Sequence, residues 1–75
     1  MIKEQELKSI TKKFGQRIRD ERTKQGISQE ELGFRTGLDR TYISGIERGE
    51  RNPSLKNIAK IAIALKINLN ELFTL

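Results

Sequence analysis

The sequence predicts an all-α fold of five helices in one domain that spans residues 1–75. Apolar residues recur at steps of three and four along several stretches, which is the spacing of one face of an α-helix. Residues that begin or end helices, namely serine, aspartate and glycine, stand between those stretches. Seventy-five residues suffice for one compact domain and are too few for two. No repeat or low-complexity tract interrupts the pattern, so a single helical domain is expected.

The first helix is expected over about residues 4–25. Its apolar face is marked by regular spacing, and the residues concerned are Leu7, Ile10, Phe14 and Ile18. Gly26 follows, and glycine is the residue that most readily takes the left-handed conformation at a helix end. The pattern therefore predicts a long amphipathic helix with a sharp stop.

Two short helices are expected next, over about residues 29–36 and 40–48. Ser28 and Glu31 have the spacing of a capping box, in which each side chain binds the backbone N–H of the other residue. Gly37 suits the turn between the helices, and Asp39 suits the N-cap of the second one. The spacing predicts two helices joined by a tight turn.

The C-terminal part, about residues 54–75, is expected to form two more helices. Ser54 caps a strongly apolar helix, which breaks near residues 66–68, and a last short helix follows over about 69–73. This part carries more apolar surface than one small core can bury, so a homodimer is expected. Its predicted interface residues are Leu65, Ile67, Leu69, Phe73 and Leu75, while Leu72 is expected to close the core.

The amino-acid composition of the chain argues against several classes of function. The chain contains no cysteine and no histidine, so disulfides, thiolate or imidazole metal sites and the usual general base are missing. We therefore expect no enzyme, no catalytic residue, no metal, no cofactor and no small-molecule ligand. No apolar run reaches the roughly 18 residues of a membrane span, so a cytoplasmic protein is expected. The net charge of +5 favours polyanionic partners without naming one.

The two short helices form the clearest constellation. Two helices joined by a short glycine-containing turn are the signature of a helix-turn-helix, and Gly33 without a side chain lets them cross closely. An ordinary helical hairpin would explain the glycines and aliphatic residues equally well. It would not explain the polar face of the second helix, which carries Arg40, Thr41 and Ser44 beside Tyr42.

Four stretches of the chain match one pattern: GISQEEL at 26–32, GLDRTYIS at 37–44, IERG at 46–49 and NPSL at 52–55. Together they resemble the Cro/CI-like (XRE) family of repressors, over about residues 14–73. The resemblance implies a lambda-repressor-like DNA-binding domain and a transcription regulator. Within the family, DRTYISGIER at 39–48 with RN at 51–52 looks most like the controller proteins of restriction-modification systems, which are small dimers that regulate their own gene and the endonuclease gene.

The resemblance and the chemistry of the side chains together suggest a DNA interface. The N-terminal part of helix 40–48 would lie in the major groove, where Arg40 can bind guanine O6 and N7. Thr41 and Ser44 are further candidates for base contacts, and Tyr42 either meets DNA or packs its ring against the turn. Contacts to phosphates or flanking bases are expected from Gln29, Arg48, Arg51 and Asn52.

Acidic residues in the central segment need a structural role if it binds DNA. Residues 27–53 hold four arginines against five acidic residues, a net charge of −1. The charge of Asp39 is expected to be stabilised by the backbone N–H groups of the helix that it caps. By resemblance, Glu47 pairs with Arg22 of the first helix, which would remove a repulsive carboxylate from the interface.

A dimer with two-fold symmetry would read an inverted-repeat operator in double-stranded DNA, with half-sites about one helical turn apart. Two alternatives stay open from the sequence. One is a phage-type repressor or antitoxin-like autoregulator, which shares most of these residues. The other is a protein-interaction adaptor, which would show no preference among DNA sequences.

Overall fold

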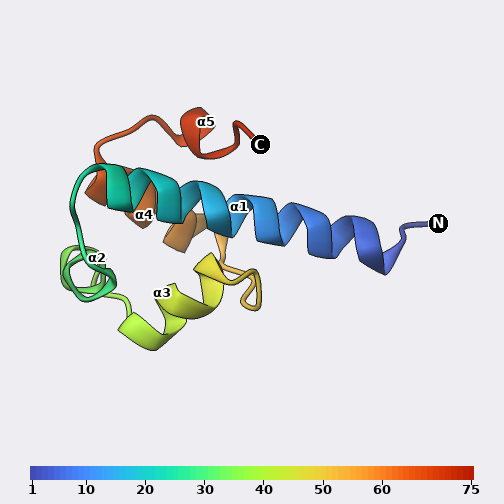
Figure 1. The fold of residues 1–75 in the computed structure, drawn as a ribbon, viewed down its shortest axis with the longest axis horizontal. Helices are drawn as coiled ribbons and strands as arrows, with labels where there is room; N and C mark the ends of the chain where they lie inside the picture. The colour runs from blue at the N-terminus through green and yellow to red at the C-terminus, as the bar shows by residue number, and fades with distance from the viewer.

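The computed structural model describes all 75 residues and contains five α-helices and no β-strand, so the predicted all-α fold is confirmed (Figure 1). In chain order they are α1 (Glu4–Lys24), α2 (Gln29–Thr36), α3 (Arg40–Glu47), α4 (Leu55–Leu65) and α5 (Leu69–Leu72). In Figure 1, α2 and α3 lie on one side of the long helix α1, and α5 lies on the opposite side. The N-terminal part of α1 projects beyond the other helices.

Three of the helices begin at a side chain that accepts a hydrogen bond from a backbone N–H in the first turn. Such a cap satisfies a donor that the helix itself leaves unpaired, and it stabilises the helix by about 0.5–2 kcal/mol. The acceptor and donor pairs are Ser28 with Glu31, Asp39 with Thr41 and Ser54 with Asn57. The sequence-based caps of α2, α3 and α4 are therefore confirmed.

The full capping box expected at α2 is wrong in its second half. The Ser28 hydroxyl accepts from the Glu31 N–H at 3.0 Å, but the Glu31 carboxylate does not reach back. It accepts instead from Arg35 Nε at 2.9 Å, one turn further along the same exposed face. The Glu31 carboxylate therefore pairs with a side chain of the same helix and not with the backbone of the N-cap.

The turn between α2 and α3 depends on two glycines. Gly37 has φ of 75°, the left-handed conformation that ends α2. A Cβ on Gly33 would lie 2.8 Å from the Leu38 carbonyl oxygen and 3.6 Å from Ile43 Cδ1. The turn and α3 therefore pack directly against the backbone of α2, which fixes the angle between α2 and α3.

The core lies among α1, α2, α3 and α4, with α5 as a lid. Its largest side chains are fully buried, and each contributes about 1.5–3 kcal/mol to stability through the hydrophobic effect. They are Ile18, Leu32, Ile43, Ile46, Ile61, Leu65 and Leu72. The prediction of Leu65 as a dimer-interface residue is wrong, because it is 0% exposed and lies on the inward face of α4. Leu72 closes the core as expected.

A buried ion pair joins α1 to α3. Arg22 donates from Nε to Glu47 Oε2 at 2.7 Å and from Nη2 to Oε1 at 3.0 Å, and its Nη1 binds the Ile27 carbonyl at 2.7 Å. Gln29 donates a further hydrogen bond to Glu47 at 3.0 Å. No buried side-chain polar atom lacks a partner. Each buried polar atom of the pair thus has a hydrogen-bond partner, which is the condition for burying charge at an acceptable cost.

A second polar cluster, not anticipated from the sequence, centres on buried Glu21. Gln25 and Arg17 donate hydrogen bonds to its carboxylate at 3.1 Å each, and these bonds lower the pKa of Glu21 below its ordinary value. The same two side chains also reach other helices, because Gln25 binds the Leu65 carbonyl and Arg17 binds the Glu71 carbonyl. The cluster therefore ties α1 to the ends of α4 and α5.

The buried pair makes a stability prediction. Arg22→Ala should destabilise the fold more than Arg19→Ala by about 1–3 kcal/mol, because it leaves the buried Glu47 carboxylate with Gln29 as its remaining side-chain donor. Arg19 is exposed and its side chain has no ion-pair partner, so it is the matched control. The measurement is urea unfolding of both variants, and equal midpoints would contradict the structural role of the pair.

Candidate nucleic-acid interface

One face of α3 is polar and carries Arg40, Thr41 and Ser44, and we call it the recognition face. The opposite face of α3 belongs to the core. Ile43 and Ile46 point inward and are fully buried. Arg40 and Thr41 are exposed in the first turn of α3. Together with Ser44 and Gln29 they line a hollow of about 160 Å³ that contains no apolar side chain. The structure therefore gathers four of the predicted contact residues at the place where the N-terminus of α3 meets the start of α2.

Gln29 is held by the buried ion pair. A carboxylate can only accept, so the amide nitrogen of Gln29 faces Glu47, at 3.0 Å. The second N–H of that amide and its Oε1 make no hydrogen bond within the protein. The start of α2 thus offers one donor and one acceptor beside Arg40, and the position of Glu47 determines how they are presented.

Tyr42 packs against α4 rather than standing free. It contacts the core from its edge, and its hydroxyl oxygen accepts a hydrogen bond from Asn57 Nδ2 at 3.1 Å. The guanidinium carbon of Arg51 lies 5.9 Å from the centre of the Tyr42 ring, within range of a cation–π contact. A hydroxyl that accepts one bond still has its own hydrogen to donate. The packing and the DNA contact considered for Tyr42 are therefore compatible.

The loop after α3 carries the other predicted contact residues. Arg48 binds Ser44 Oγ and pairs with Glu50 at 3.2 Å. Asn52 is exposed. Arg51 lies over α3, where a Cβ on Gly45 would come within 2.5 Å of Arg51 Cγ. The lack of a side chain at Gly45 thus makes room for the Arg51 side chain against α3. The sequence did not predict this role, because a mid-helix glycine gives no local signal for it.

Acidic charge on this side of the molecule is largely neutralised. Of the five acidic residues in 27–53, Glu30 alone lacks a partner. The remaining four interact as follows: Glu31 with Arg35, Glu47 with Arg22, Glu50 with Arg48, and Asp39 with the Thr41 N–H. Arg40 and Arg51 are the two arginines of the segment without a carboxylate partner. A segment of net negative sequence charge therefore leaves two cations free at its surface.

A second surface lies near the C-terminus. Of the predicted interface residues, Leu69, Phe73 and Leu75 are exposed, whereas Ile67 is half-buried against the core. The Phe73 ring stacks on Phe14 of α1 with centroids 5.2 Å apart. Phe73 and Leu75 border a mainly apolar groove of about 160 Å³, whose other apolar walls are Ile10, Phe14, Pro53 and Ile58. The contribution of Ile10 to this groove was not anticipated, because its spacing predicted only that it lies on the apolar face of the first helix.

Other classes of site find no support in this arrangement. The acidic side chains form no group of three that could hold a metal ion. No helix has both the length and the apolar character that crossing a bilayer requires.

Comparison with known proteins places this geometry in a family. A helix-turn-helix family profile (HTH_3) matches residues 18–72. The crystal structure of the restriction-modification controller protein C.AhdI from Aeromonas hydrophila superposes with a TM-score of 0.83 at 59% identity, covering 84% of this chain and 96% of that one.

Two curated relatives agree with this match. Control protein C.BamHI from Bacillus amyloliquefaciens is 53% identical over 60 residues, which is 79% of this chain and 74% of that protein. Control protein C.MunI from Mycoplasma sp is 44% identical over 69 residues, which is 91% of this chain and 93% of that protein. The chain therefore belongs to the HTH_3 (XRE-type) helix-turn-helix family of DNA-binding transcription regulators, in which its relatives include restriction-modification controller proteins.

Proposed function

We propose that this regulator is a restriction-modification controller protein that binds an inverted-repeat operator as a homodimer, with α3 in the major groove of each half-site. The observation that carries the proposal is the polar hollow at the N-terminus of α3, where Arg40 and Thr41 are exposed and unpaired. The high identity to controller proteins supports this role within the family. Because its target is the cell's own DNA, the proposed place of action is the cytoplasm.

Reading of the base sequence is assigned to the first turn of α3. The Arg40 guanidinium has the paired donors that match guanine O6 and N7, and it makes no ion pair that would have to be broken first. Thr41 offers a hydroxyl and a methyl group, which suit a base edge or thymine. The Ser44 hydroxyl accepts from Arg48 and keeps its own hydrogen to donate to a base edge.

Holding of the DNA backbone is assigned to the flanks of α3. The free N–H of Gln29 and the backbone N–H groups at the start of α2 suit a phosphate. On the other flank, Arg48, Arg51 and Asn52 project from one loop and are exposed. Arg51 is positioned beside Tyr42, so these two side chains would meet DNA together.

Dimerisation is assigned to the groove at the C-terminus. Leu69, Phe73 and Leu75 leave apolar surface exposed, and the groove beside Ile10 gives a second copy a place to pack. Figure 1 places α5 and α3 on opposite sides of α1. A partner that packs on the α5 side would therefore leave Arg40 and Thr41 of α3 free for DNA, while it would approach Arg51 and Asn52, which also line the groove.

The proposal is tested first through Arg40. Arg40→Ala should cost about 1–3 kcal/mol on an operator selected from random duplexes and much less on a scrambled duplex, because the lost contact is to a base. The measurement is titration of both duplexes by fluorescence anisotropy. Equal losses on both would show that α3 does not read bases through Arg40. Failure of the wild-type protein to select any sequence would favour an adaptor instead.

Arg48→Ala is the matched control in that experiment. If Arg48 contacts phosphates, its loss should weaken both duplexes alike and reduce the slope of log K against log salt by roughly one. Arg40→Ala should reduce the preference for the operator, and Arg48→Ala should reduce the affinity for both duplexes.

The dimer is tested by sedimentation of the protein alone at micromolar concentration. Leu75→Glu should shift a dimeric wild-type protein towards monomer, because a carboxylate in an apolar interface is costly to desolvate. Phe34→Glu is the control, since Phe34 is 86% exposed on α2 and does not line the groove. A wild-type protein that is monomeric both with and without DNA would contradict the dimer, and equal effects of the two variants would contradict this placement of the interface.

A further inference from the structure

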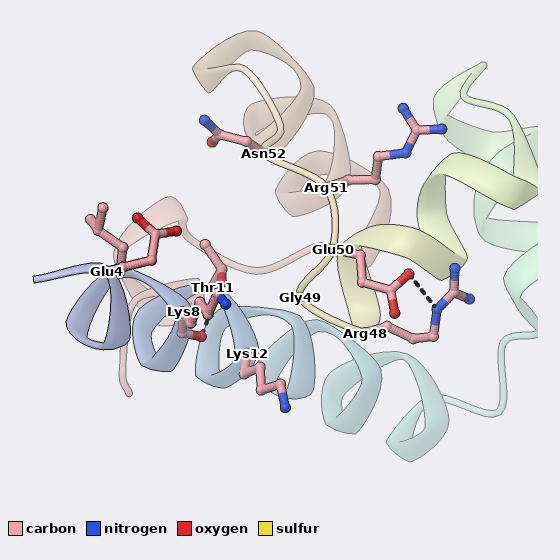
Figure 2. A pocket seen from close by; sticks show the side chains of 10 residues that line it. Glu4, Lys8, Thr11, Lys12, Arg48, Gly49, Glu50, Arg51 and Asn52 are labelled. Atoms are coloured by element: carbon pink, nitrogen blue, oxygen red, sulfur yellow. Dashed lines mark hydrogen bonds and ion pairs between the residues drawn. The ribbon is translucent and has the colours of Figure 1, made fainter.

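A broad cleft separates the N-terminal half of α1 from the loop that follows α3. It measures about 620 Å³, and Figure 2 shows its two walls, with α1 on one side and the loop from Arg48 to Asn52 on the other. The charged residues along it are Glu4, Lys8, Lys12, Arg48, Glu50 and Arg51. Four cations against two carboxylates give this cleft a net positive charge.

The lysines of the cleft are uncompensated. Glu50 is paired with Arg48 at 3.2 Å, whereas neither Lys8 nor Lys12 forms an ion pair, although Glu4 lies one turn before Lys8 on the same helix. Both lysines line the cleft from α1. An unpaired ammonium group on a flexible stem can meet a phosphate without first giving up another partner.

The loop is held directly against α1 at Lys12. Gly49 has φ of 76°, and a Cβ on it would lie 2.8 Å from Lys12 Cγ and 2.9 Å from Lys12 Cα. Figure 2 shows Lys12 and Gly49 close to each other, where the loop approaches α1. A DNA strand that meets the loop at Gly49 would therefore pass close to Lys12.

We infer that Lys8 and Lys12 of α1 form a second phosphate-binding surface, which grips the DNA backbone where it leaves the loop. This inference rests on the proposed docking of α3 and its loop on DNA. The two lysines are separated by about 6 Å of helix rise, and one DNA strand carries a phosphate about every 3.4 Å along its axis. They can therefore meet different phosphates of the same strand.

Duplex DNA fits this cleft better than a small anion does. The cations come from two elements that line an open cleft, and no polar side chain is buried at its floor to hold one compact ligand. An extended polyanion that crosses both walls can contact the cations of both. The expected contribution is general affinity and not sequence preference, because these side chains would touch only the backbone.

The test compares charge removal at neighbouring lysines of one helix. Lys8→Gln and Lys12→Gln should each reduce the slope of log K against log salt by roughly one on the selected operator and on the scrambled duplex alike. Lys13→Gln is the control, because Lys13 is exposed beside Lys12 in sequence but does not line the cleft. It should leave the slope unchanged.

The outcomes separate this inference from the function on which it rests. If Lys12→Gln and Lys13→Gln have equal slopes while Arg40→Ala still loses specificity, the second surface is wrong and the docking of α3 stands. If the wild-type protein shows no preference for its selected operator, the proposed function itself fails. Unchanged unfolding midpoints in all three lysine variants are expected, and they confirm that the slopes report binding.

Discussion

The placement of three helices in this regulator depends on one buried ion pair. Arg22 and Glu47 join the longest helix to the end of α3, and the Glu47 carboxylate also orients Gln29 at the start of α2. Burying two charges is costly unless their hydrogen bonds are complete, and Arg22 completes its own by binding the Ile27 carbonyl. The pair thus fixes three helices relative to one another at the point where DNA recognition is proposed. The role of the pair is to hold the recognition face in position, whereas hydrophobic burial of the core supplies most of the stability.

The same arrangement resolves the electrostatic difficulty of this segment. Five acidic residues among 27–53 would repel a polyanion if all were free, but capping and pairing neutralise four of them. Arg40 and Arg51 remain unpaired, one in the first turn of α3 and the other in the loop after it. In the proposed complex, recognition by such a surface would rely on the geometry of a few free cations rather than on a large positive field. This favours discrimination between sequences over general attraction to DNA.

Most of the fold could be predicted from the sequence because its signals are local. Ser28, Asp39 and Ser54 cap helices by contacts within three residues, and Gly37 ends α2 by its own conformation. Contacts between distant residues were harder to predict. Leu65 was placed at the surface because an apolar stripe does not reveal which of its members the core will use. Gly45 went unnoticed because Arg51, which packs on it, lies on another element. The Glu21 cluster went unnoticed because Arg17 and Gln25 bind carbonyls at the ends of α4 and α5.

We propose that α3 reads bases in the major groove of two symmetric half-sites. Dimethyl sulfate interference on the selected operator tests it most directly, because the reagent methylates guanine N7 in the major groove and adenine N3 in the minor groove. We expect that binding is lost when guanine N7 is methylated in two symmetric clusters about one helical turn, roughly 34 Å, apart. Interference from adenine N3 alone, or a single cluster with no symmetric mate, would contradict it.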